Sequence, residues 1–143
     1  MKSLKLFLLS GLLMLLFTSC GEDPLSERIL GTWILQSSEI SNCTRDEEDN
    51  SPLTLVDENN CVPTASGTLC NLTIVFTLTE ANIESGTNPN NLEFCMSSYT
   101  LNESNDTGLL QFSDPISFSL VDDNLVLDFQ DNGCDQSFIL ERQ

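Results

Sequence analysis

Hydrophobic and polar residues alternate one by one along much of this chain. The clearest runs are 72–79, 116–120 and 125–130, in which a leucine, isoleucine or phenylalanine takes every second position, and Phe138 and Leu140 continue the pattern near the end. A period of two places neighbouring side chains on opposite faces of a β-strand, one face on a core and the other in solvent. These segments are therefore predicted to be strands that bury one face.

Short polar segments rich in turn-forming residues separate the runs. They are 41–51, 85–91, 104–108, 122–124 and 131–133. Their spacing predicts an all-β domain of about eight antiparallel strands, either an up-and-down barrel or a sandwich. The polar segment 41–66 is expected to be an extended loop with at most one short strand, and the only helix expected is a single turn at 24–28.

The first nineteen residues have the pattern of an export signal. Lys2 and Lys5 precede an apolar run at 6–17, whose 12 residues are too few for the roughly 20 that span a bilayer. The run is followed by a motif that resembles a lipobox, in which a lipidated cysteine becomes the new N-terminus; its residues are Phe17, Thr18, Ser19 and Cys20. We expect a signal peptide at 1–19, a lipidated tether at 20–28 and one domain at 29–143. The alternative is an ordinary cleaved signal ahead of a disulfide cysteine.

The four residues that follow Cys20 indicate where in the cell envelope the protein is located. Gly21, Glu22, Asp23 and Pro24 resemble the acidic surface-export signals of Bacteroidota lipoproteins. Acyl chains contribute about 0.8 kcal/mol per buried CH₂, so a multiply acylated Cys20 would anchor stably in a membrane. We therefore expect a lipid-anchored protein of the outer membrane, and both a periplasmic and a surface-exposed orientation stay open.

Charge narrows the range of partners. The chain has 22 acidic and five basic residues, and loss of Lys2 and Lys5 leaves Arg28, Arg45 and Arg142, a net charge of 3 − 22 = −19. Nucleic acid is excluded as a partner, because binding it depends on cationic side chains. The acidity is interpreted as a source of solubility rather than as a specific cation site. The same holds for the cluster 46–49, which lacks the glycine and spacing of an EF-hand.

Residues for enzymatic chemistry are scarce. The chain has no histidine, the predicted mature part has no lysine, and no Gly-x-Ser-x-Gly, Gly-x-Gly-x-x-Gly or Cys-x-x-Cys motif occurs. Acidic residues are too numerous for a chance carboxylate pair to indicate a hydrolase. We expect no enzyme, no catalytic residue, no metal site and no cofactor.

The first predicted strand carries a family motif. Its residues 29–35 contain Gly31-x-Trp33, which resembles the Gly-x-Trp of lipocalins, and with residues 70–76 it is similar to the lipocalin-like lipoprotein domains of Bacteroidota. The resemblance implies a barrel in which Gly31 allows close backbone passage and Trp33 plugs the narrow end. It also implies that Arg142 of the last strand packs over Trp33; the alternative is a terminal arginine free in solvent.

Five cysteines would remain after lipidation of Cys20, and disulfides are expected in an oxidising compartment. They are Cys43, Cys61, Cys70, Cys95 and Cys134. The family resemblance implies a Cys70–Cys95 bridge across the 85–91 turn. Closeness in sequence suggests Cys43–Cys61 as a second bridge, and the odd number leaves one cysteine over.

Two functions remain open. An eight-stranded barrel is either filled by its own side chains or just wide enough for one small ligand. Most of the six phenylalanines of the predicted mature chain alternate with polar neighbours and are therefore expected to point inward. The six are Phe76, Phe94, Phe112, Phe118, Phe129 and Phe138. If they gather at the Trp33 end, an apolar cup remains that would bind a small apolar or amphipathic ligand. If they meet in the middle, the domain is a packed structural or protein-interaction module.

Overall fold

The computed structural model describes residues 23–44 and 50–143. The predicted signal peptide, Cys20 and the acidic cluster 46–49 lie outside these residues. The described chain forms one short helix and eleven strands: α2 Leu25–Arg28, β1 Gly31–Ser41, β2 Ser51–Leu55, β3 Cys61–Thr64, β4 Gly67–Phe76, β5 Ala81–Asn88, β6 Asn91–Ser97, β7 Tyr99–Asn102, β8 Thr107–Leu110, β9 Ile116–Val121, β10 Asn124–Asp131 and β11 Cys134–Arg142. Within these ranges no helix has the length and apolar character to cross a bilayer.

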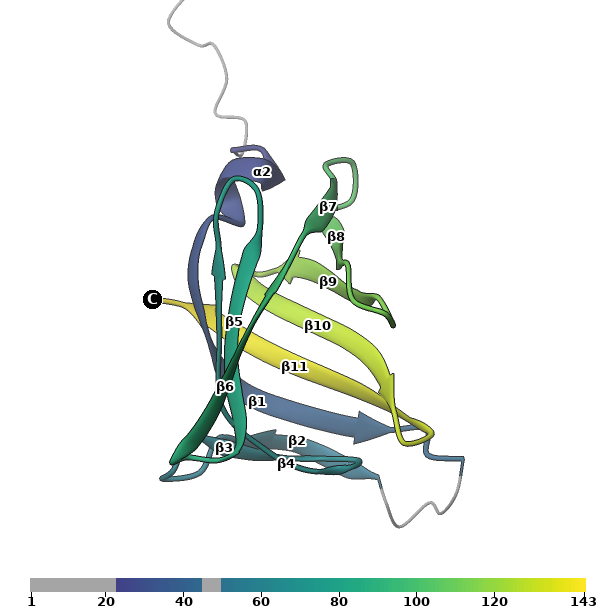
Figure 1. The fold of residues 1–143 in the computed structure, drawn as a ribbon. Helices are drawn as coiled ribbons and strands as arrows, with labels where there is room; N and C mark the ends of the chain where they lie inside the picture. The colour runs from purple at the N-terminus through teal and green to yellow at the C-terminus, as the bar shows by residue number, and fades with distance from the viewer. Residues whose placement is uncertain (1–22, 45–49) are drawn as a thin grey trace, which may run out of the picture.

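The strands form a single antiparallel sheet that curls into a nearly closed barrel (Figure 1). Nine strands follow the order β6-β5-β4-β1-β11-β10-β9-β8-β7, while β2 pairs with β1 and β3 pairs with β4. The all-β class is therefore confirmed. The two ends of the order are β6 and β7, which are consecutive in the chain, so the barrel has one flank at which its sheet ends.

The expectation of about eight strands was too low, because segment 41–66 is not the long loop that its polar composition predicted. β4 pairs with β1 only along residues 31–34 of β1. Beyond that point β2 pairs with residues 37–40 of β1, and β3 pairs with residues 67–70 of β4. Backbone hydrogen bonds at the ends of longer strands thus organise two short strands whose own side-chain pattern is irregular.

The alternating runs bury the faces that their period predicted, except at Leu78, which lies beyond the end of β4 and is 83% exposed. Leu72, Ile74 and Phe76 of β4 and Leu125 and Leu127 of β10 are all at most 5% exposed. Two tight turns keep neighbouring strands in register. Asp122-Asp123 joins β9 to β10 and Asn132-Gly133 joins β10 to β11, each with two positive φ angles, as type I′ hairpin turns require.

Candidate functional site

One end of the barrel is closed by Trp33 and the helix beside it. The Trp33 side chain is 1% exposed, and its Nε1 donates a hydrogen bond to the Ile29 carbonyl at 2.8 Å. Leu25 and Ile29 are also buried there. The Arg142 guanidinium lies 4.9 Å from the centroid of the Trp33 ring, so the contact implied by the family resemblance is present. Such a contact contributes about 0.5 to 1 kcal/mol when exposed.

The β7–β8 turn holds α2 over this end. The Glu103 carboxylate accepts hydrogen bonds from the backbone amides of Leu25 at 2.6 Å and Ser26 at 3.0 Å. These amides begin the helix, where a negative charge is favourable. Arg28, at the other end of the helix, forms an ion pair with Asp106 at 2.5 Å. Residues far apart in sequence thus fix the short helix in place.

Aromatic side chains fill the interior next to Trp33. The ring centroid of Phe76 lies 5.1 Å from that of Tyr99 and 5.4 Å from that of Phe118. The Tyr99 hydroxyl donates a hydrogen bond to the Thr77 carbonyl at 2.5 Å, and burial raises the pKa of Tyr99 above 10.0. This part of the barrel, from α2 to the three rings, is called the closed end below.

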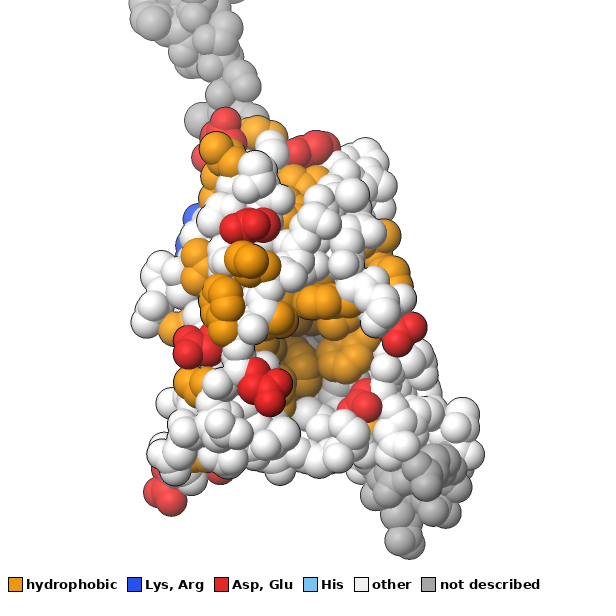
Figure 2. All heavy atoms as spheres, in the orientation of Figure 1, with side chains coloured by type: hydrophobic (Ala, Val, Ile, Leu, Met, Phe, Trp, Pro, Cys, Tyr) orange, Lys and Arg blue, Asp and Glu red, His pale blue; other side chains and the backbone are white. Residues whose placement is uncertain are grey.

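The rest of the interior contains a hollow of about 220 Å³, called the cup below. Ten of its twelve lining residues are apolar and come from both sides of the barrel. The twelve are Leu69, Leu72, Ile74, Ile83, Ser85, Cys95, Leu110, Phe112, Ile116, Leu127, Phe129 and Phe138. Figure 2 shows the hollow from outside, with hydrophobic side chains on its walls and floor.

The cup opens on the flank of the barrel rather than at its far end. Figure 1 places β2 and β3 at the end opposite α2, where Val62 of β3 is 1% exposed and Ser38 Oγ donates to the Pro63 carbonyl at 3.0 Å. In Figure 2 the hollow faces the viewer, and Figure 1, in the same orientation, places β6 on one side of it and the β9–β10 pair on the other. The opening thus lies where the sheet order ends.

The phenylalanines divide between the two regions. Phe76 and Phe118 belong to the closed end, whereas Phe112, Phe129 and Phe138 line the cup. The prediction that Phe94 points inward was wrong, because its side chain is 65% exposed. The β5–β6 register pairs Ile83 with Cys95, so the odd-numbered residues of β6 face the cup and Phe94 faces out.

Both predicted disulfide pairings were wrong. The bridges are Cys43–Cys134 and Cys61–Cys70, and Cys95 is the one cysteine of the described residues outside a disulfide. Cys70 and Cys95 lie on β4 and β6, which are separated by β5. Cys61 and Cys70 are instead directly opposite each other on β3 and β4. Because β3 was not predicted, this neighbour of Cys70 was missed.

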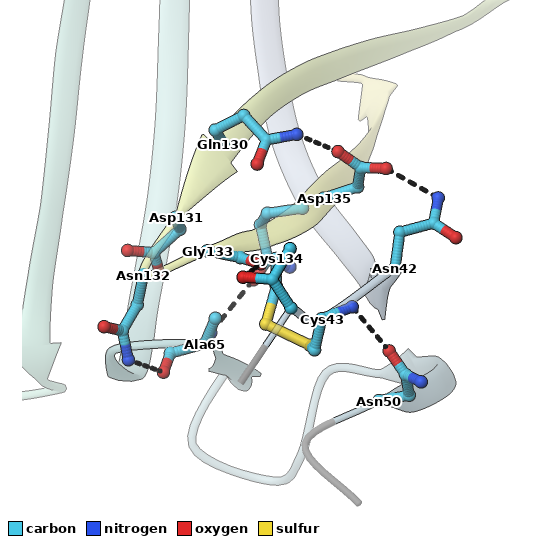
Figure 3. Close-up of a disulfide and its surroundings, with 12 residues drawn as sticks. Asn42, Cys43, Asn50, Ala65, Gln130, Asp131, Asn132, Gly133, Cys134 and Asp135 are labelled. Carbon is cyan, nitrogen blue, oxygen red and sulfur yellow. Dashed lines mark hydrogen bonds between the residues drawn. A yellow bond between two sulfur atoms is a disulfide. The ribbon is translucent and has the colours of Figure 1, made fainter. Parts of the chain in front are cut away.

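The Cys43–Cys134 bridge joins the chain just after β1 to the start of β11 (Figure 3). Ser41 and Asp135 are opposite each other in the β1–β11 ladder, which brings the two cysteines together. Asn42 Nδ2 donates to Asp135 Oδ2 at 2.6 Å, and Asn132 Nδ2 donates to the Ala65 carbonyl at 3.1 Å. The bridge therefore braces the β10–β11 turn, at the end of the barrel away from α2.

In the part of the chain that the structure describes, no three His, Cys, Asp or Glu side chains form a group that could hold a metal ion. Comparison with family models, curated proteins and solved structures found no match. The cup is the candidate functional site because it is an apolar hollow that opens to solvent.

Proposed function

We propose that this protein is a lipid-anchored lipoprotein of the cell envelope, held at the outer membrane by Cys20, whose barrel binds a small apolar or amphipathic ligand in the cup. The observation that carries the proposal is the apolar hollow that opens to solvent between β6 and β9–β10. Ligand sites are concave and mostly apolar, with a few polar groups at defined places. Here the polar groups on the lining are Ser85 and Cys95.

The size of the cup favours partial enclosure of the ligand. Its volume of about 220 Å³ is below the roughly 300 to 1,000 Å³ of sites that enclose a drug-sized molecule. Placing an apolar chain in the cup removes hydrophobic surface from water, at roughly 25 cal/mol per Å². An amphipathic molecule would leave its polar head at the opening.

Export from the cytoplasm is supported by the two disulfides, because such bonds persist in oxidising compartments. Lipidation is supported by the lipobox-like residues 17–20. The intact mass of the protein extracted from membranes should correspond to a chain that starts at Cys20 and carries acyl groups. A soluble product with unmodified Cys20 would contradict the anchor and leave the cup hypothesis standing.

Ligand binding can be tested on the chain from Gly21 to Gln143, which contains every strand of the barrel. We expect N-phenyl-1-naphthylamine, an uncharged probe whose emission rises in apolar surroundings, to bind saturably at micromolar concentration. Ser85→Phe should abolish binding, because it places a large ring in the cup. Asn82→Phe is the matched control, because residue 82 lies on the same strand with the opposite parity and faces out.

Cys95 provides an independent measurement at the same place. It is exposed and lines the cup, so a thiol reagent such as an alkyl maleimide should reach it and block the probe. A bound ligand should in turn slow the alkylation. If the probe binds equally well to the unmodified chain, the alkylated chain and Ser85→Phe, the cup is not the binding site.

The second candidate function is a structural or protein-interaction module, and one observation favours it. Leu92, Phe94 and Met96 on the outer face of β6 are 39%, 65% and 61% exposed, which is unusual for neighbouring large apolar side chains. This reading predicts that changing all three to serine abolishes capture of an envelope partner and leaves probe binding unchanged. If no ligand binds the cup, the interaction module becomes the leading hypothesis.

A further inference from the structure

Carboxylates lie beside the cup on several sides. Glu93 is opposite Ser85 in the β5–β6 ladder and two residues from Cys95, so it shares their face of the sheet. Asp131 ends β10, two residues after Phe129 and on the same face. Asp114 lies in the exposed segment between Phe112 and Ile116. Figure 2 shows acidic groups around the hollow.

None of these three carboxylates is neutralised by an ion pair with a described arginine. Asp131 Oδ2 accepts hydrogen bonds from the Ser66 amide at 3.0 Å and its hydroxyl at 2.8 Å, which orient the side chain without neutralising it. Glu93 and Asp114 are exposed. No ion pair with an arginine is found at any of the three among the described residues.

The basic side chains of the described residues lie at the closed end, away from the cup. Arg28 pairs with Asp106 beside α2, and Arg142 lies over Trp33. Both side chains therefore belong to the closed end, and in the described ranges they are the only basic residues. An anionic head at the cup would meet carboxylates with no nearby described cation to offset them.

We propose that the cup selects an amphiphile with an apolar tail and a cationic head, such as a long-chain amine or quaternary ammonium, and discriminates against fatty acids. This inference rests on the proposed function and assigns its ligand class. The tail occupies the apolar hollow, which is too small to enclose the whole molecule, and the head remains at the opening among Glu93, Asp114 and Asp131. Complementary charge at such a place supplies specificity more than raw affinity.

The test uses three ligands with the same twelve-carbon tail and different heads. Dodecyltrimethylammonium, dodecanol and dodecanoate each displace N-phenyl-1-naphthylamine from the chain of residues 21–143, below the micelle concentration of the charged ligands. We expect the cation to bind at least tenfold more tightly than the carboxylate, with the alcohol between them. This ratio should shrink in concentrated salt, because exposed charges are then screened within a few ångströms.

A pair of matched triple variants separates the carboxylates at the cup from the overall acidity of the chain. Glu93→Gln, Asp114→Asn and Asp131→Asn should together remove most of the preference for the cation and leave dodecanol binding unchanged. The control variant, Glu84→Gln, Asp122→Asn and Asp123→Asn, changes the net charge by the same amount, at an outward position of β5 and at the β9–β10 turn. It should keep the preference.

The outcomes separate failure of the charge preference from failure of the cup as a ligand site. If the alcohol binds while cation and carboxylate bind equally, or the carboxylate binds more tightly, the charge inference is overturned and the cup remains a ligand site. Equal loss of preference in both triple variants also overturns it, because the effect would then come from net charge alone. If neither the probe nor the alcohol binds the folded chain, the proposed function itself fails, and this inference fails with it.

Discussion

The closed end and the cup share strands β4 and β9, yet one is filled and the other is hollow. At the closed end Trp33, Phe76 and Phe118 are at most 2% exposed. At the cup Phe112 and Phe129 line an open space and remain half-buried. The closed end differs in having α2 packed across it, tied down by Glu103 and Arg28. The filled end of the barrel is thus the end that an element outside the strands covers.

The two disulfides are unevenly placed with respect to these regions. Both lie away from α2, with Cys61–Cys70 at the β3–β4 ladder and Cys43–Cys134 at the start of β11 (Figure 1). Covalent bracing is therefore confined to the part of the barrel that α2 does not cover.

The largest expected effect comes from removing the longer bridge. Cys43→Ala with Cys134→Ala releases a loop of sequence separation 91, which should lower the free energy of unfolding by about 4 to 5 kcal/mol in the chain-entropy account. Cys61→Ala with Cys70→Ala releases a separation of 9 and should cost about 2.6 kcal/mol. Urea unfolding followed by the fluorescence of Trp33, the only tryptophan, measures both. Equal losses would show that the bracing does not depend on loop length.

The next prediction compares the loss of stability when one phenylalanine from each region is replaced by alanine. Phe118→Ala should destabilise the fold by about 3 to 5 kcal/mol, because it leaves a cavity in close-packed surroundings. Phe112→Ala only widens a space that already opens to solvent, so its cost should stay below about 1.5 kcal/mol. The same unfolding measurement applies. If the two losses were similar, the distinction between a filled end and an open cup would be wrong.

The smallest expected effect is a shift in the pKa of Tyr99 at the closed end. Tyr99 is the only tyrosine, so the near-ultraviolet absorbance of phenolate reports on it alone. Because burial raises its pKa in the folded protein, the titration midpoint should lie above 10.0 before denaturation and return to 10.0 in urea. The neutral phenol is the favoured folded form, so its contribution to stability is complete below pH 10.0 and is lost as pH rises through the folded pKa. Tyr99→Phe should remove the signal, and a native midpoint at or below 10.0 would argue against burial of the ring.

Local patterns predicted those features that depend on neighbours in the sequence. Within the runs 72–79 and 125–130, the strands were recognised with the correct buried face, because strand pleating makes orientation a property of adjacent residues. The first strand nevertheless ends at Phe76, and Leu78 beyond it is exposed. β2 and β3 escaped recognition, since pairing with β1 and β4 organises them rather than their own alternation. Phe94 was assigned to the wrong face, because the alternation of β6 does not say which face is inside.

By itself, the sequence determined an all-β chain with short turns, a buried Trp33 and an acidic surface with few cations. Only the tertiary structure decided which cysteines pair, because Cys43 and Cys134 are 91 residues apart and meet through strand register. It also decided where the cup lies, because a hollow depends on which elements cover the sheet and on where the sheet stops pairing. Such long-range contacts arise from packing of the whole chain, and no local period encodes them.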